Sequence, residues 1–413
     1  MLAPEPFFEP RGTPFSEYHR IKALVEQGHH VDLVTYPIGA DVDLPNLRII
    51  RSVPMPFVKK VPIGPSATKV FLDVLLTVTA LRQAMRQSYD AIHSHEEAGI
   101  LGVWLSRRLG IPHLYDMHSS LPQQLTNFKF TRSSLIAKVF ESAESYMVHG
   151  SKVVITICQE LQDTVERMGV GDRSVLIENV MGGDVEAVAG PGRDALRAKW
   201  GIEADAPLLL YTGTFEAYQG LELLLESVAR LQKTHPHARQ LIVGGNPVQV
   251  DELRARAVAI GANVVCTGQR PPNEIPHFVE ACDILVSPRI SGTNTPLKIY
   301  SYLRSGRPIV ATNLLTHTQV LSDATAVLVE PKPEPFAAAL ARLIDHPEER
   351  LRISTAAAAL AASRYSRDAY LTRTHQAYVR LMDGIGRSSS GARLVASEAA
   401  ASAELRAGGT RRP

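Results

Sequence analysis

The sequence has few of the features that mark secreted, zinc-binding or membrane-spanning proteins. Its three cysteines, Cys158, Cys266 and Cys282, form no CxxC pair, so we expect neither a disulfide framework nor a zinc site. The N-terminus has no basic segment followed by a long apolar one, which argues against a signal peptide. The most apolar run, 70–78, contains Asp73 and is well short of the roughly 20 residues that a membrane-spanning helix needs. These absences predict a cytoplasmic protein.

The chain also lacks an excess of either charge. Its formal net charge is +2, so bulk charge gives no reason to expect a nucleic-acid partner. Apolar residues make up 45% and charged residues 21%, which is ordinary for a globular protein. Because 413 residues exceed the usual size of one hydrophobic core, we expect two domains.

Short β-branched runs alternate with helical segments, which indicates parallel sheets with helices on both faces. In the first half we predict strands at 31–35, 91–93, 113–115 and 153–156, and helices at 16–27, 70–87, 99–109 and 135–150. In the second half we predict strands at 208–211, 240–243, 264–266, 283–286 and 309–311, helices at 221–234 and 296–305, and a helical region at 331–380. Only Leu2 and Ala3 precede the first loop, so we expect the true start codon to lie upstream.

These patterns predict an α/β protein with an N-terminal domain over 1–185 and a C-terminal domain over 186–365. The glycine-rich stretch at 182–192 suits a hinge between them. Residues 366–384 are predicted to form a final helix. The Ser/Gly/Ala/Arg-rich tail at 385–413 has too little apolar surface to pack, and we predict that it is disordered.

Ligands of open parallel sheets bind outside the carboxyl ends of the strands, so the residues that follow each strand are the candidates for a site. The first loop leads through Arg11, Gly12 and Thr13 into a helix. Free amide groups at that helix start would favour an anionic group, and glycine allows a close approach. A plain strand-to-helix turn is the alternative. No GxGxxG occurs here, which weighs against a dehydrogenase.

Polar residues also follow two other strands of the first half. Asp116 and His118 come after a strand and should face the cleft, with His118 as a ligand-contacting residue. His93 and His95 would point the same way from a strand. We place no third metal ligand beside them, so a structural role is favoured over a metal site.

Glycine turns follow three strands of the second half, at Gly213, at Gly244 and at 268–270, where Arg270 ends the turn. Such turns suit a surface that approaches a flat or phosphorylated ligand.

The segment at 289–298 is the most informative part of the chain. Arg289 follows a strand, and Thr293, Asn294 and Thr295 lead into a helix with Pro296 in its first turn. The amides of this turn, the helix dipole, and the charges of Arg289 and Lys298 together suit a diphosphate. A solvated surface lysine is the alternative for Lys298, but it would leave the turn unexplained.

From Met1 to about Gly384 the chain resembles a family 4 retaining glycosyltransferase of the GT-B fold. The order of its motifs carries the resemblance, in the segments 151–161, 177–180, 209–225, 268–284, 305–312 and 365–381. The resemblance implies two facing Rossmann-like domains with a cleft between them. It also implies an acceptor-binding N-terminal domain, a donor-binding C-terminal domain, and a last helix that crosses back to the first.

The chain departs from the family at four donor positions. The family carries two glutamates eight positions apart, where this chain has Thr293 and Ser301. The family's Arg and Lys for the donor diphosphate correspond to Thr214 and Gln219. Four ionic groups are thus replaced by neutral ones, and a charged hydrogen bond is worth about twice a neutral one.

The resemblance therefore implies transfer of a sugar from a nucleoside diphosphate to an acceptor hydroxyl with retention, in glycan, glycolipid or polysaccharide biosynthesis, with no resident cofactor. Lys298 and Arg289 would stabilise the leaving diphosphate in place of a metal ion, and His118 would contact the transferring sugar. The expected donor residues are Gly213, Thr214, Gln219, Gly244, Arg270, Thr293, Asn294, Thr295, Pro296 and Ser301. The expected cleft residues on the acceptor side are Arg11, Gly12, Thr13 and Asp116.

The acceptor is a sugar or a lipid-linked sugar. Aromatic and cationic residues interleave at 57–60 and 128–132, which suits contact with an anionic membrane at its inner face. Ordinary solvated loops are the alternative. Two other functions stay open at this point: a nucleotide-sugar epimerase or synthase on the same scaffold, and a non-catalytic nucleotide-sugar-binding protein.

Overall fold

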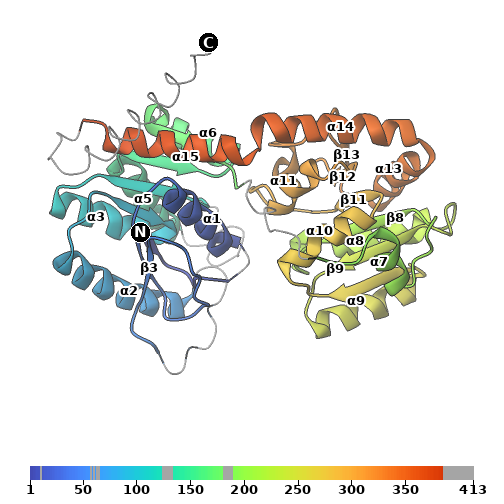
Figure 1. The fold of residues 1–413 in the computed structure, drawn as a ribbon, viewed down its shortest axis with the longest axis horizontal. Coiled ribbons are helices and arrows are strands. Elements are labelled where there is room, and N and C mark those ends of the chain that lie inside the picture. The colour runs from blue at the N-terminus through green and yellow to red at the C-terminus, as the bar shows by residue number, and fades with distance from the viewer. Residues whose placement is uncertain are drawn as a thin grey trace, which may run out of the picture.

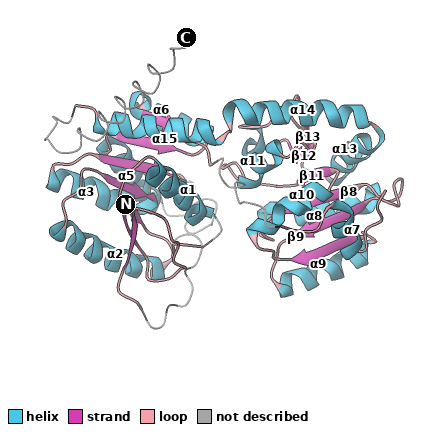
Figure 2. Ribbon diagram, in the orientation of Figure 1, coloured by secondary structure: helices cyan, strands magenta, loops and turns pink. Residues whose placement is uncertain are grey.

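The chain folds into two α/β halves, each built on a parallel sheet (Figure 1). A computed structural model describes residues 1–9, 12–55, 58, 61, 66–122, 134–179 and 189–384. The first sheet has the strand order β3-β2-β1-β4-β5-β6-β7, and the second has the order β10-β9-β8-β11-β12-β13. All pairs among these strands are parallel. Helices pack around both sheets (Figure 2).

The first half alternates strands with helices. Its strands are β1 (Leu2–Ala3), β2 (Val31–Thr35), β3 (Leu47–Arg51), β4 (Ile92–His95), β5 (His113–Met117), β6 (Val153–Thr156) and β7 (Ser174–Leu176). Its α-helices are α1 (Gly12–Glu26), α2 (Ala67–Arg86), α3 (Gly99–Leu109), α5 (Ser134–Gly150) and α6 (Gln159–Arg167), and the 3-10 turn η1 (Glu96–Ala98) joins β4 to α3.

The second half repeats this alternation. Its strands are β8 (Leu208–Thr212), β9 (Arg239–Val243), β10 (Val264–Gly268), β11 (Ile284–Ser287), β12 (Ile309–Thr312) and β13 (Val327–Val329). Its helices are α7 (Arg193–Lys199), α8 (Leu221–Leu231), α9 (Pro247–Ile260), α10 (Ile275–Ala281), α11 (Leu297–Arg304), α12 (Leu315–Thr318), α13 (Pro333–Asp345), α14 (Pro347–Arg364) and α15 (Arg367–Met382).

The last helix returns to the first half, as the GT-B fold requires. Helix α15 begins at Ser366, whose side chain accepts a hydrogen bond from the amide of Ala369. It then packs on α1, β6 and β7, while α14 lies over the second half (Figure 1). Its residues Tyr370, Ala377 and Leu381 belong to an apolar cluster that also contains strand residues of both sheets. The predicted two-domain α/β architecture is confirmed.

Several elements differ from the sequence-based expectation. Helix α1 begins at Gly12, four residues before the predicted start, because the positive φ of Gly12 (52°) lets the chain turn directly into the helix. The strands β3, β7 and β13 were not predicted: they are short sheet-edge or near-edge strands whose residues are partly exposed, so they lack the fully apolar pattern of buried strands. The helices α7, α9 and α10 were not predicted either.

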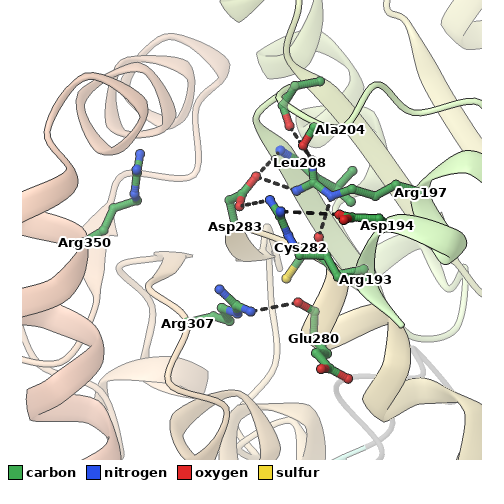
Figure 3. Close-up of polar contacts among 12 residues, drawn as sticks. Arg193, Asp194, Arg197, Ala204, Leu208, Glu280, Cys282, Asp283, Arg307 and Arg350 are labelled. Carbon is green, nitrogen blue, oxygen red and sulfur yellow. Dashed lines mark hydrogen bonds and ion pairs between the residues drawn. The ribbon is translucent and has the colours of Figure 1, made fainter. Parts of the chain in front are cut away.

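A partly buried ion pair ties the start of the second sheet together (Figure 3). The guanidinium of Arg197 on α7 donates to Asp283 at 2.8 Å and to the carbonyls of Ala281, Ala204 and Ala206. The same Asp283 oxygen accepts the amide of Leu208 at 2.8 Å. Since Leu208 begins β8 and Asp283 precedes β11, this network lies at the ends of the strands opposite to the candidate site.

Some predicted features fall outside the part of the chain that the structure describes. They are Arg11, most of the 182–192 hinge, the tail at 385–413, the segment 128–132, and all of 57–60 except Val58. In the described ranges, no helix combines the length and the apolar character needed to cross a membrane.

Candidate active site

The order of strands reverses at one point in each sheet, and both reversals carry the candidate residues. In the second sheet, β8 and β11 are neighbours; β9 and β10 are added on the outer side of β8, and β12 and β13 on the outer side of β11. The carboxyl ends of strands at such a switch point form the usual ligand crevice of an open α/β sheet. The corresponding pair in the first sheet is β1 and β4.

Two glycine turns close tightly over the end of β8. A Cβ atom on Gly244 would lie 1.8 Å from the carbonyl oxygen of Gly213, a distance that no side chain allows. Both glycines have φ near 140–150° (147° and 140°), a region that other residues avoid. The structure thus brings Gly213 and Gly244 together, and backbone rather than side chains forms this part of the surface.

Lys298 reaches from α11 to the end of β8. Its Nζ donates to the carbonyl oxygen of Thr212 at 3.2 Å and lies 3.9 Å from the centre of the Tyr211 ring. Burial lowers the pKa of Lys298 well below its ordinary value, and the positive charge of Arg289 lowers it further. Among the described residues, no carboxylate lies within 4.0 Å of this ammonium group.

Arg289 follows β11 and lies on the same side of the sheet. Its guanidinium donates to the carbonyl oxygen of Asn294 at 2.8 Å and to Thr316 at 2.7 Å, and it stacks over the Tyr218 ring at 4.8 Å. Its Nε is buried with no hydrogen-bond partner among the described residues. Two cations therefore lie close together with no described acidic partner, an arrangement that favours an anionic ligand.

The turn before α11 lies against the first half. Pro296 is the N-cap of α11, one residue before the first helical turn where it was predicted. The Asn294 side chain donates a hydrogen bond to the carbonyl oxygen of His118 at 2.9 Å. Gln319 bridges the two halves as well: its side chain accepts a hydrogen bond from the backbone amide of Glu160 at 2.8 Å and donates one to the carbonyl oxygen of Thr293. The positive end of α11 is thus at the boundary between the two halves.

His118 faces a buried ionic network in the first half. Its Nε2 lies 3.0 Å from Nδ1 of His95 and 3.3 Å from an oxygen of Asp116. Burial lowers the pKa of His118, although Asp116 opposes this effect. Burial alone would raise the pKa of Asp116, but Arg20 at 3.0 Å and the surrounding histidines hold it well below its ordinary value.

The crossing-back helix completes this network. Thr374 on α15 accepts a hydrogen bond from Arg20 at 3.0 Å, and the Tyr370 ring lies 5.0 Å under the same guanidinium. The Tyr378 hydroxyl lies 2.6 Å from Nδ1 of His93. The surroundings of Asp116 therefore depend on a helix that is about 250 residues away in the sequence.

The sequence placed no third metal ligand beside His93 and His95, but the structure brings a carboxyl group next to them. Ligand atoms of His93, His95 and Asp116 all lie within 4.8 Å of one another, because β4 and β5 pair in register. The charge of Asp116 is already matched by Arg20, and this buried cation disfavours a metal ion beside it. The structural interpretation of the two histidines stays a prediction, and the charge of Arg20 favours it.

Sequence reasoning missed a group of carboxyl side chains at the other switch point. Glu5 follows β1, Glu96 follows β4, and Glu17 lies on α1. Burial raises the pKa of Glu17 well above its ordinary value, and the nearby carboxylate of Glu96 adds to this effect. Alternation of apolar and polar residues gives no signal for a buried glutamate on a helix, so only tertiary contacts identify the group.

The remaining predicted residues lie in varied surroundings. Arg270 stacks on Trp200 at 5.0 Å and donates to the carbonyl of Thr267, so its described contacts do not join it to Lys298. The Ser301 hydroxyl donates to the Lys298 carbonyl of its own helix at 2.9 Å. Gln219 is buried, and its Oε1 lacks a partner among the described residues.

Three other predicted positions are more open. Thr214 is exposed beside Gly213, Gly12 is exposed at the start of α1, and Thr13 is partly buried. The carboxyl groups near α1 disfavour the anionic ligand that was predicted at this helix start. The binding roles of all these residues stay predictions.

Two known families match most of the chain. Residues 192–359 match the family described as "Glycosyl transferases group 1", and residues 18–179 match the "Glycosyl transferase 4-like domain". The first match covers every strand of the second sheet, and the second match covers the strands of the first sheet except β1.

Characterised relatives are similar over about three quarters of the chain. An α-D-kanosaminyltransferase from Streptomyces kanamyceticus is 28% identical over 308 residues, which cover 71% of this chain and 78% of that protein. A D-inositol 3-phosphate glycosyltransferase from Acidothermus cellulolyticus is 24% identical over 346 residues, which cover 78% of this chain and 76% of that protein.

Solved structures share the fold over nearly the whole length. Sucrose-phosphate synthase from Thermosynechococcus elongatus superposes with a TM-score of 0.73 at 20% identity, covering 92% of this chain and 98% of that one. HepE from Anabaena in complex with UDP-glucose superposes with a TM-score of 0.65 at 16% identity, covering 91% and 97%.

Proposed function

Because the chain belongs to the group 1 glycosyltransferases and has their GT-B fold, we propose that it moves a sugar from a nucleoside-diphosphate sugar to an acceptor hydroxyl with retention of configuration. The relatives named above are transferases, so a non-catalytic binding protein or an epimerase is not favoured. The donor enters as a substrate, and the reaction uses no resident cofactor and no metal ion.

The pair of unmatched cations at the end of β8 carries this proposal. Lys298 lies beside the Gly213 turn, where a Cβ atom on Gly213 would be 3.7 Å from Lys298 Nζ, and Arg289 is near enough to lower the pKa of Lys298. Removing a lysine from water without a counter-ion is unfavourable, which is why its pKa is depressed. A diphosphate at this turn would restore the ionised form of Lys298 and would accept hydrogen bonds from exposed backbone amides.

The same cations fit the chemical step. As the bond between the anomeric carbon and the diphosphate oxygen breaks, the diphosphate gains negative charge. The acceptor oxygen bonds to that carbon, and its hydroxyl proton passes to the departing diphosphate. Positive groups already fixed beside the leaving oxygen stabilise the transition state more than the ground state. In this proposal Lys298, Arg289 and the amino end of α11 do the work of the metal ion in other transferases. They also compensate for the neutral residues Thr214 and Gln219.

His118 is the proposed contact to the transferring sugar. Its Nε2 is engaged by His95 and Asp116, whereas its Nδ1 has no hydrogen-bond partner in the described parts of the chain. Its carbonyl holds Asn294 across the two halves. A sugar bound between the halves could therefore use Nδ1 of a neutral imidazole without disturbing the network around Asp116.

The test is release of nucleoside diphosphate from a panel of nucleotide sugars, beginning with UDP-glucose, with and without acceptor extracts. Lys298→Ala should lower turnover at least about 100-fold, the usual loss when one transition-state donor is removed. The matched control is Lys332→Ala, because Lys332 is two-thirds exposed and pairs only with Glu330. Unchanged turnover in Lys298→Ala would refute the role of this cation.

We further propose that the first half contacts a membrane surface, where a lipid-linked acceptor would be presented. Large apolar side chains are exposed on three helices that border one groove, α2, α3 and α5. They include Val70, Phe71, Val74, Met85, Ile100, Trp104, Leu135 and Val139. Exposed arginines flank them at Arg107 and Arg108, a composition that suits an anionic lipid interface.

Vesicle co-sedimentation tests the membrane proposal. Replacing Phe71 and Val74 by serine should weaken binding to vesicles that contain phosphatidylglycerol. Val258→Ser is the control, because Val258 is 81% exposed on α9 of the second half. Equal binding of the two variants would contradict the assignment of this face.

A further inference from the structure

The turn that leads into α11 is held in place by the short helix α12. Thr316 on α12 donates a hydrogen bond to the carbonyl oxygen of Asn294 at 2.6 Å. Gln319, the C-cap of α12, donates one to the carbonyl oxygen of Thr293 at 2.6 Å. Arg289 adds a further hydrogen bond to the Asn294 carbonyl at 2.8 Å. Two successive carbonyl groups of this turn are therefore fixed by residues of α12.

Helix α12 is itself anchored to the second sheet through His317. Nδ1 of His317 donates a hydrogen bond to the carbonyl oxygen of Thr312 at 2.8 Å, and its Nε2 lies 2.8 Å from the hydroxyl of Ser287. Thr312 ends β12 and Ser287 ends β11. His317 is fully buried, and burial lowers its pKa to about 3, so the ring stays neutral and keeps both bonds at neutral pH. Helix α12 is thus a rigid support at the carboxyl ends of two strands.

Gln319 also reaches the first half of the molecule. Its Oε1 accepts a hydrogen bond from the backbone amide of Glu160 at 2.8 Å. Glu160 is the second residue of α6, whose N-cap Cys158 makes no side-chain capping hydrogen bond. The first amides of a helix have no partner within that helix. A side chain of the second half therefore caps a helix of the first half (Figure 1).

The same turn makes two more contacts between the halves. The Asn294 side chain donates to the carbonyl oxygen of His118 at 2.9 Å and accepts from Sγ of Cys158 at 3.7 Å. His118 directly follows β5, and Cys158 lies two residues beyond β6. The ends of two strands of the first sheet are thus joined to one turn of the second half, so this turn cannot shift relative to His118 without breaking hydrogen bonds.

The spacing between the halves matters for the proposed reaction. The bond that breaks joins a sugar contacted by His118 in the first half to a diphosphate held by Lys298 and Arg289 in the second half. A displacement of about 1 Å in such an arrangement can lower a rate on the order of 100-fold. Neither half sets this spacing by itself, since it depends on the hydrogen bonds between them.

We propose that Gln319 is a positioning residue for the transfer, which holds the turn before α11 at a fixed distance from His118. Its side-chain amide has an acceptor and donors on one rigid plane. The acceptor binds the start of α6 and a donor binds the Thr293 carbonyl, so one group joins the acceptor side to the donor side. Gln319 acts through these partners and touches neither sugar nor diphosphate. This inference rests on the proposed transferase function and adds a residue to it.

Hydrogen exchange of the Glu160 amide tests the bridge directly, with UDP as the probe. UDP bound at the turn should hold it more firmly and slow the exchange of this amide about 10-fold, the equivalent of one hydrogen bond. Gln319→Met has a similar length but neither polar atom, so the Glu160 amide should exchange about 10-fold faster and no longer respond to UDP. Exchange that is the same in the parent and in Gln319→Met would overturn the inference.

A double-mutant cycle with His118 tests the effect on the reaction, using the nucleotide sugar that gives the most nucleoside diphosphate. Gln319→Met should lower kcat about 10- to 100-fold and change KM for the donor less than about threefold, because the donor cations remain in place. In the His118→Ala background the same substitution should cost less than about threefold, because residues that act as one unit are not additive. Fully additive losses would contradict the inference.

Two further variants separate positioning from capping. Gln319→Glu still accepts the Glu160 amide but cannot donate to the Thr293 carbonyl, so it should keep the slow exchange of that amide and still lower kcat. Full activity of Gln319→Glu would show that the cap alone suffices and would refute the two-sided role. Thr318→Ala is the matched control, because Thr318 is the exposed neighbour of Gln319 in the chain. Its kcat and its exchange should equal those of the parent.

Failure of this inference can be told apart from failure of the proposed function. A parent protein that binds no UDP and releases no nucleoside diphosphate from the panel refutes the transferase proposal, and the role of Gln319 with it. A parent that binds UDP and transfers sugar, beside a Gln319→Met variant that behaves in the same way, refutes only the role of Gln319.

Discussion

The two sheets have the same kind of switch point and opposite charges there. In the second half, strands of apolar residues such as β8 end in glycine turns beside Lys298 and Arg289. In the first half, β1 and β4 end beside Glu5 and Glu96. The backbone architecture is shared, so the side chains that follow the strands set the difference: two cations lie at the switch point of the second half, and carboxyl groups lie at that of the first.

The interiors of the two halves also differ in polarity. The central strand β8 is buried and almost wholly apolar, as expected for a strand covered on both faces. Strands β4 and β5 are buried too, but they carry His93, His95, His113 and Asp116. A polar core of this kind needs all its partners in place, so the first half should be the more sensitive to single polar substitutions.

The largest expected effect is on the ion pairs of the two halves, of which one is buried and the other partly exposed. Asp116→Asn leaves Arg20 buried without a counter-charge and should lower the free energy of unfolding by roughly 3–5 kcal/mol. Asp283→Asn should lower it by only about 2 kcal/mol, because Asp283 is 26% exposed and Arg197 keeps its carbonyl acceptors. Urea unfolding of both variants measures the difference, and equal losses would contradict the comparison.

Glu96 in the first half should give the stability a pH dependence of its own. The pKa of Glu96 is about 7 in the folded chain against an ordinary 4.5, so the folded state binds the extra proton and this contribution to stability is lost as the pH rises from about 5 to 7. Glu96→Gln removes this titration. The stability of the variant relative to the parent should therefore rise with pH, by up to about 1.4 kcal/mol per pH unit.

Urea unfolding of the parent and of Glu96→Gln at several pH values checks this slope. The buried histidines titrate in both proteins, so their contributions cancel in the difference. A difference that is constant between pH 5 and 7 would show that Glu96 does not change its protonation on folding.

The smallest expected effect concerns the glycine turns of the donor side. A Cβ atom at Gly244 would collide with the Gly213 carbonyl, whereas a Cβ atom at Gly268 would meet nothing within 4 Å, although both glycines have positive φ. Gly244→Ala should therefore weaken UDP binding about 10-fold through the displaced turn. Gly268→Ala should leave UDP binding nearly unchanged, with a loss of about 1 kcal/mol in stability from backbone strain. Calorimetry on both variants compares them, and a similar weakening in the two would indicate that strain alone matters.

Sequence patterns predicted many of the strands and helices of both halves. The strands at 31–35 and 153–156 and the helix at 99–109 match the structure residue for residue. Apolar or periodic runs of this kind predict the type of an element directly from the sequence. The sequence also pointed to Lys298, Arg289 and the turn before α11, because cations close in sequence to a predicted helix start can be recognised without the structure. The short strands β3, β7 and β13 were missed, since partly exposed edges carry no such pattern.

The amino-acid sequence by itself determined the two α/β halves, their order and the cations beside α11, because hydrophobic periodicity and local turn chemistry are properties of neighbouring residues. Tertiary structure alone decided that Asp116 is paired with Arg20 and supported by α15, and that Glu5, Glu17 and Glu96 share one buried region. These residues lie on separate elements, and charge interactions act through space over a few ångströms. Their chemistry therefore becomes visible only when the folded sheet brings the ends of its strands together.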